Sequence, residues 1–170
     1  LKITSLDGVT CEKLVPINVF TGVDPASSVK RGADYSVIFN LGVDDENNRY
    51  ALPYYRKHAT PLNLAEAIIK RSRDENLFIP GLNIKENPRN SKNNRLESLQ
   101  PIFAKRQMFI NKKQQELMDE LLLFPRGKHD DILDGLYYAN KGSFSPYHKV
   151  DDVPLLSRGR HNIFSDWQLV

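Results

Sequence analysis

The sequence predicts an α/β domain in which three antiparallel strands come first and helices follow. Two β-rich runs, 17–24 and 34–43, are separated by small, loop-forming residues. A third run, 49–57, returns after the turn-forming stretch "DDENN". Apolar residues at helical spacing then indicate an amphipathic helix over 60–74. With 170 residues, 40% of them hydrophobic and 26% charged, the chain suits one globular domain.

The boundaries of these elements follow from residues with special backbone properties. Pro53 lies inside the third run, and proline cannot donate to a strand ladder, so we expect an edge position or a bulge there. Thr60 is a good N-cap residue, and Pro61 suits the first position of a helix. The first half of the chain is therefore predicted as an antiparallel meander followed by a helix.

After the first helix the pattern is less regular. Residues 75–84 hold at most one short strand, and 85–94 have the composition of a loop. A short helix is expected around Arg95–Leu99, and 101–110 alternates like a β-ribbon.

Two stronger helical patterns close the domain, over 111–124 and 130–141. Leu117, Leu121 and Leu122 are expected on one face of the first. The second begins with Asp residues, which the helix dipole favours at an N-terminus.

The predicted domain covers residues 17–141, between a lead-in or linker, 1–16, and a C-terminal tail, 142–170. We expect the tail to dock on the domain or on a partner. Because the chain begins with Leu rather than Met, we expect it to be one domain of a longer protein. The lone Cys11 excludes an internal disulfide and a cysteine-rich zinc site and fits a reducing compartment. No apolar run approaches the roughly 20 residues of a membrane span, and no signal peptide is visible.

Positive charge is concentrated in one segment although the net charge is only +3. Between Lys85 and Lys113, eight basic residues stand against Glu86 and Glu97. Such an excess attracts a polyanion such as nucleic acid, and a solvated surface is the alternative. The basic residues are Lys85, Arg89, Lys92, Arg95, Lys105, Arg106, Lys112 and Lys113.

Two acids lie at the ends of predicted elements. Asp24 ends the first strand and Asp131 begins the last helix, and such positions converge in an α/β domain. Carboxylates suit Mg²⁺ or Mn²⁺, and two such ions about 4 Å apart can promote phosphodiester cleavage. Asp24 before Pro25 also fits a turn, Asp130 fits an N-cap, and His129 fits a ligand, a DNA contact or a surface residue. No nucleotide-binding glycine motif occurs.

Three blocks of the chain resemble the nuclease domain of phage and viral terminase large subunits. They are "FTGVDPASS…ADYSVIFNLG", "SKNNRLESLQPIF" and "ELLLFPRGKHDDILDGLYYA", and they occur in the family's order over most of 17–140. The resemblance implies an RNase H-like fold, in which a mixed five-stranded sheet is flanked by helices. It implies an endonuclease that holds Mg²⁺ or Mn²⁺, as two ions, and cuts concatemeric DNA during genome packaging. The implied partners are double-stranded DNA, an ATPase domain in the same parent chain, the portal and the small terminase subunit. The implied location is the procapsid portal in the host cytoplasm, with no membrane.

The family's site residues carry over by position. Asp24 and Asp131 match the catalytic, metal-holding acids, and Asp130 and Asp34 match auxiliary ligands. Asp134 lies one helical turn after Asp131, so it and His129 are expected to support the ligands. The resemblance and the basic segment together give the expected DNA-contacting residues, which are Lys92, Arg95, Lys105, Arg106, Arg126 and Lys128.

One departure from the family concerns its central acid. Family members place this acid on a strand after the first long helix, followed by another helix. Because a parallel crossover needs about a dozen residues, we expect a strand–helix unit to be missing near Phe78–Ile79. Glu75 is the candidate substitute for the acid. The alternatives are another RNase H-like nuclease, of the resolvase or transposase type, and a non-catalytic module that binds DNA or the portal.

Overall fold

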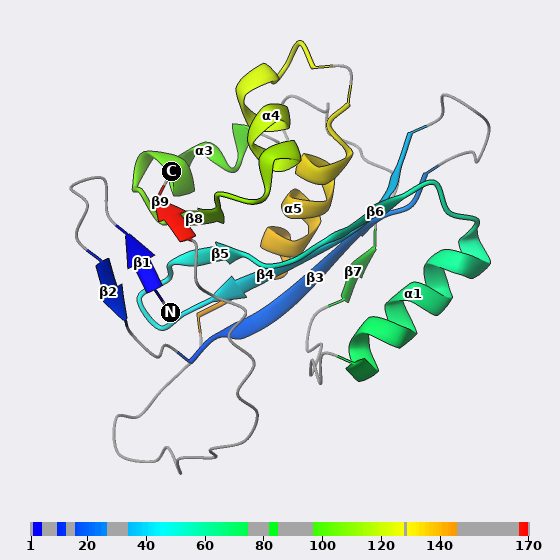
Figure 1. Cartoon of the computed structure of the whole chain (residues 1–170), viewed down its shortest axis with the longest axis horizontal. Coiled ribbons are helices and arrows are strands. Elements are labelled where there is room, and N and C mark those ends of the chain that lie inside the picture. The colour runs from blue at the N-terminus through cyan, green and yellow to red at the C-terminus, as the bar shows by residue number, and fades with distance from the viewer. Residues whose placement is uncertain are drawn as a thin grey trace.

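The computed structural model describes residues 2–4, 10–12, 16–26, 34–74, 82–84, 97–127, 129–145 and 167–169. In these residues, nine strands form one mixed sheet, in the order β2-β1-β9-β8-β5-β4-β3-β7, with β6 also paired to β4. Helices cover both faces, as Figure 1 shows, with α3, α4 and α5 on one face and α1 on the other. The prediction of an α/β fold with a mixed sheet flanked by helices is confirmed.

The two longest of the described strands form an antiparallel pair. Strands β3 (Asn18–Asp24) and β4 (Ser36–Val43) pair along their length, with Asp24 opposite Val37. Strands β5 (Arg49–Ala51) and β6 (Tyr55–Lys57) both return along β4, as predicted. The break between them contains Pro53, which explains why the third run forms two short strands.

Parallel strands flank this antiparallel unit. Strand β7 (Leu82–Ile84) is parallel to β3, and β8 (Met108–Asn111) is parallel to β5. Beyond β8 the edge is extended by β9 (Trp167–Leu169), β1 (Lys2–Thr4) and β2 (Thr10–Glu12). Strands β1 and β2 come from the predicted lead-in and β9 from the predicted tail, so the backbone of both segments contributes to the sheet.

The helices follow the predicted pattern with one exception. Helices α1 (Pro61–Asp74), α4 (Gln115–Leu123) and α5 (Asp131–Lys141) lie where helical spacing predicted them. The prediction of a β-ribbon over 101–110 is confirmed only in its second half, where β8 lies, because α3 (Gln100–Ala104) occupies the first half. Pro101 suits the first turn of a helix, and Ile102 is buried in the core. No helix in the described ranges is long and apolar enough to cross a bilayer.

One short strand follows the first helix, as predicted. Strand β7 follows α1 and pairs with β3 as a parallel neighbour, in agreement with the one short strand allowed for residues 75–84. The 14 residues of α1 are themselves the crossover, which satisfies the length that a parallel connection requires. Strand β7 consists of Leu82, Asn83 and Ile84 and therefore carries no acid. The proposed junction at Phe78–Ile79 and Glu75 lie outside the described residues.

Side chains alternate between two cores across the central strands. On β4, Val37, Phe39 and Leu41 pack toward the helices α3, α4 and α5, whereas Ile38 packs toward α1. Helix α5 lies directly on β3 and β4. Gly22 on β3 and Gly135 on α5 permit this approach because neither has a Cβ. A Cβ at Gly22 would overlap the carbonyl oxygen of Gly135 and the backbone nitrogen of Ala139.

Candidate metal site

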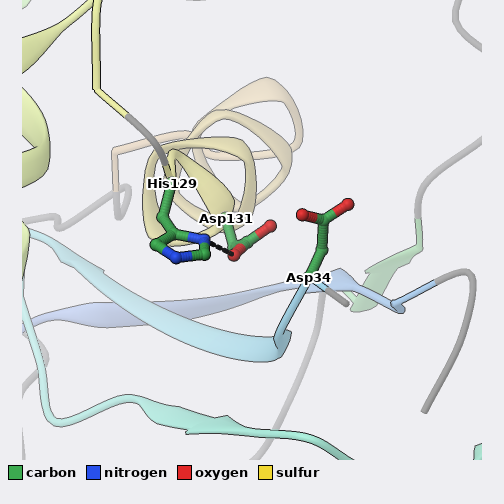
Figure 2. Close-up of side chains that lie close together, drawn as sticks. All are labelled: Asp34, His129 and Asp131. Atoms are coloured by element: carbon green, nitrogen blue, oxygen red, sulfur yellow. Dashed lines mark ion pairs between the residues drawn. The ribbon is translucent and has the colours of Figure 1, made fainter. Parts of the chain in front are cut away.

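Three side chains that can bind a metal converge at the end of the sheet where β4 begins. Asp34 lies two residues before β4, His129 lies two residues before α5, and Asp131 is the first residue of α5. One ligand atom from each lies within 4.8 Å of the others. In Figure 2 the carboxylate of Asp131 lies between the imidazole of His129 and the carboxylate of Asp34. The described part of the chain contains no other such group of three.

The backbone holds Asp131 in this position. The N–H of Tyr35, at the entry to β4, donates to Oδ2 of Asp131 at 3.2 Å. Nδ1 of His129 lies 3.8 Å from the same oxygen, as the dashed line in Figure 2 shows. Asp131 is buried, His129 is half-buried and Asp34 is exposed, so the cluster is open on the side of Asp34.

The electrostatic environment of Asp131 favours a cation. Burial raises the pKa of Asp131, the Tyr35 N–H opposes this, and the neighbouring carboxylates of Asp34 and Asp130 raise the pKa further. Crowded carboxylates are relieved either by a proton or by a bound positive charge.

The donor set fits a divalent cation. Two carboxylates and one imidazole are ordinary metal ligands. Nδ1 of His129 is buried and makes no hydrogen bond within the described residues, so this nitrogen, which faces Asp131, is available to bind a metal ion. A cluster of Asp34, His129 and Asp131 can therefore hold a metal ion.

Tyr35 connects this cluster to a group of rings and cations. Its ring meets the His129 ring edge-on, with centroids 5.5 Å apart, and stacks on His58 at 4.1 Å. The guanidinium carbon of Arg56 lies 4.1 Å from the centroid of the Tyr35 ring. Strand β6 and the residue after it therefore place Arg56 and His58 beside the cluster.

Glu120 on α4 joins the same network through Arg56 and through the first turn of α5. Its Oε2 accepts hydrogen bonds from the N–H groups of Ile132 and Leu133 at 3.0 and 3.3 Å. Its Oε1 lies 3.4 Å from a guanidinium nitrogen of Arg56. Burial raises the pKa of Glu120 to about 7, although Arg56 and the two backbone N–H groups favour the charged form.

The remaining predicted acids lie near the cluster but outside it. Asp24 is buried at the end of β3, on the strand face that also carries Phe20 and Gly22 and packs on α5. Asp130 is half-buried, and its carbonyl accepts the N–H of Asp134. Asp134 is buried one turn into α5. The structure thus groups Asp131 with Asp34 and His129, and it leaves Asp24 at the same end of the sheet.

The structure describes only some of the predicted DNA-contacting residues. Lys105, Arg106 and Arg126 are exposed. Lys92, Arg95 and Lys128 lie outside the described residues.

Sequence reasoning assigned no role to Glu120, Arg56 or Tyr35. A signal for Glu120 was present, since it stands three residues after Leu117 on the apolar face of its helix, where an acid is unexpected. Arg56 shows only as part of the basic run Arg56–His58. For Tyr35 the contributing group is a backbone N–H, which has no sequence signal.

Comparison with protein-family models and with curated proteins finds no match for this chain.

Proposed function

We propose that this chain is a metal-dependent DNA endonuclease of the terminase large subunit type, with an RNase H-like domain. The observation that carries the proposal is the convergence of Asp34, His129 and Asp131 from two distant segments at one end of the sheet. Carboxylates gathered at strand and helix ends are the ligands that metal-dependent phosphodiesterases use.

The strand order supports the proposal. The order β5-β4-β3-β7 places three antiparallel strands first and a parallel strand beside β3. Helix α5 packs on β3 and β4, so its first residue, Asp131, comes to the end of the sheet where Asp24 lies. This agrees with an RNase H-like arrangement in which the first strand and the last helix contribute acids.

The side chains of the site have separate roles in this proposal. Asp131, Asp34 and His129 hold Mg²⁺ or Mn²⁺, and Asp24 and Asp130 supply further carboxylates for a second ion. When bound, such ions supply a water of lowered pKa and stabilise charge on the departing oxygen of a phosphodiester. The Tyr35 N–H keeps one oxygen of Asp131 fixed. Arg56 offsets part of the negative charge of the site.

DNA is the proposed substrate, cut as a concatemer during genome packaging at the procapsid portal in the host cytoplasm. Exposed Lys105, Arg106 and Arg126 are proposed to contact phosphates, which position a duplex without reading its sequence. The other proposed partners are an ATPase domain of the same parent chain, the portal and the small terminase subunit.

Plasmid cleavage tests the proposal. Supercoiled plasmid is incubated with the chain and Mg²⁺ or Mn²⁺, and the wild type is compared with Asp131→Asn, Asp34→Asn, His129→Ala and Asp24→Asn. We expect Asp131→Asn to lower the cleavage rate by about 100-fold or more, because it removes a buried charged ligand. Glu66→Gln, at an exposed acid on α1, is the control and should cut like the wild type. Undiminished cutting by Asp131→Asn would contradict the assignment of Asp131 as a ligand of the catalytic metal.

A non-catalytic DNA-binding module is the second candidate, and one observation favours it. Strand β7, beside β3, carries no carboxylate, although family members place an acid on the strand after the first long helix. A gel-shift assay in EDTA distinguishes the two functions. DNA binding without metal, together with intact plasmid in Mn²⁺, would favour the binding module. Preference for branched over linear duplexes would instead favour a resolvase-type nuclease.

A further inference from the structure

The first turn of α5 is capped by a side chain from another helix. Asp130, the N-cap residue, makes no capping hydrogen bond with its side chain. Instead, Oε2 of Glu120 on α4 accepts the N–H groups of Ile132 and Leu133. These are the two residues that follow Asp131, so Glu120 holds the backbone that carries the metal ligand.

The other oxygen of Glu120 leads back to the same ligand by a second route. Oε1 of Glu120 lies 3.4 Å from Arg56, whose guanidinium packs over the ring of Tyr35 at 4.1 Å. The N–H of Tyr35 in turn donates to Oδ2 of Asp131. Glu120 therefore contacts both the backbone that carries Asp131 and, through Arg56, the residue that fixes its carboxylate.

A packing role alone does not account for an acid at this position. Glu120 is 6% exposed, and burying a carboxylate costs free energy that a leucine of similar size would avoid. An ion pair with Arg56 alone does not require burial, because Glu116 forms one on the same helix at 3.3 Å while remaining exposed. What distinguishes Glu120 is its pair of hydrogen bonds to α5.

We propose that Glu120 is a positioning residue for the metal site, holding Asp131 through the first turn of α5 and through Arg56 and Tyr35. This inference rests on the proposed function for its consequence, which is metal affinity. Its structural part, the fixing of Asp131, is measurable without metal.

The experiment compares Glu120→Ala, Glu120→Gln and Glu116→Ala with the wild type. Mn²⁺ affinity is measured by electron paramagnetic resonance of the free ion, and exchange of the Tyr35 amide is measured by NMR in metal-free protein. Glu116→Ala is the matched control, because it removes an Arg56 partner one turn away without removing the cap of α5. If Glu120→Ala does not fold, Glu120→Asp replaces it, since the shorter side chain draws the carboxylate away from α5.

We expect Glu120→Ala to weaken Mn²⁺ binding by about 10-fold or more, as is typical when a residue that orients a metal ligand is lost. The Tyr35 amide should exchange faster in the same variant. Glu120→Gln should recover most of the affinity, because its amide oxygen still accepts hydrogen bonds from α5. Glu116→Ala should stay within about twofold, because exposed ion pairs contribute little.

Two results would overturn the inference. One is wild-type Mn²⁺ affinity in Glu120→Ala, and the other is an equal loss in Glu116→Ala. A wild type that binds no Mn²⁺, with faster Tyr35 exchange in Glu120→Ala, would leave the positioning of Asp131 in place and reject the proposed function instead.

Discussion

The two longest helices begin in opposite ways. Helix α1 is capped by its own sequence, since Oγ1 of Thr60 accepts the N–H of Asn63 at 3.2 Å. Helix α5 receives its cap from Glu120, which lies on α4. Orphan N–H groups exist at the start of every helix, and here one start is satisfied locally and the other by a tertiary contact.

Burial separates the same two helices. Helix α5 buries eight of its eleven residues, including Asp131 and Asp134. Helix α1 buries Leu64 but leaves Leu62 69% exposed. The helix that packs between the sheet and α4 is also the one that contributes a metal ligand. The comparison teaches that polar groups gain unusual chemistry where tertiary packing, rather than local sequence, determines their surroundings.

The largest effect is expected where α5 touches the sheet. Gly22→Ala would place a methyl group against the backbone of α5, which cannot move aside as a side chain would. We expect a loss of more than about 3 kcal/mol in the free energy of unfolding, measured by urea denaturation. Ala65→Leu, at an exposed position of α1, is the control and should change stability by less than about 0.5 kcal/mol. A stable Gly22→Ala protein would show that α5 does not lie this close.

The second effect is a pH dependence from the cap of α5. Because the pKa of Glu120 is raised to about 7 in the folded state, the folded chain binds more protons than the unfolded chain between about pH 4.5 and 7. Stability should therefore fall as the pH rises through this window. The pKa difference corresponds to about 3 kcal/mol. Glu120→Gln cannot titrate, so its stability should decline less than that of the wild type in urea titrations at several pH values. Parallel curves would contradict the raised pKa.

The third effect concerns the local cap of α1. Thr60→Ala removes the acceptor for the Asn63 N–H and should cost about 1 kcal/mol of unfolding free energy. Thr60→Asn keeps an acceptor and should stay close to the wild type. Thermal denaturation of both variants gives the comparison, and an equal loss in both would assign the effect to something other than capping.

The smallest effect is expected on the exposed face of α1. Leu62→Gln replaces a largely exposed side chain and should change the unfolding free energy by less than about 0.5 kcal/mol. The same exchange at Leu136 on α5, which is 2% exposed, should cost several times more, because it buries an amide in the core. Similar losses at the two positions would remove the contrast between the helices.

Local patterns predicted most of the fold. The runs that became β3 and β4 and the start of α1 after Thr60 depend on neighbouring residues, and they are confirmed. At Pro53, where an edge position or a bulge was predicted, the third run divides into β5 and β6. The errors arose where distant contacts decide. Residues 101–104 alternate like a strand, yet Ile102 is buried among residues of other elements in a helix. Strand β7 is short, and its parallel pairing with β3 is a tertiary contact that its own residues do not indicate.

The candidate site was predicted by residue but not by grouping. The sequence predicts Asp34 and Asp131 as metal ligands, but it pairs Asp131 with Asp24 and gives His129 only a supporting role. Spacing along the chain cannot show that the Tyr35 N–H brings Asp131 to the entry of β4. Nor can it show that Glu120 and Arg56 meet, because they lie on different elements and pair only in the folded chain.

The contact between Gly22 and Gly135 also determines where α5 stands along β3. Each residue advances a helix by about 1.5 Å, which is large against the narrow distance range of a hydrogen bond, so sliding α5 by one residue would disturb the 3.2 Å bond between the Tyr35 N–H and Asp131. Two backbones in direct contact resist such a slide better than packed side chains do, because side chains can change rotamer. The contact between the two glycines thus limits movement of α5 along its axis, and so it sets the position of the Asp131 carboxylate, one helical turn before Gly135.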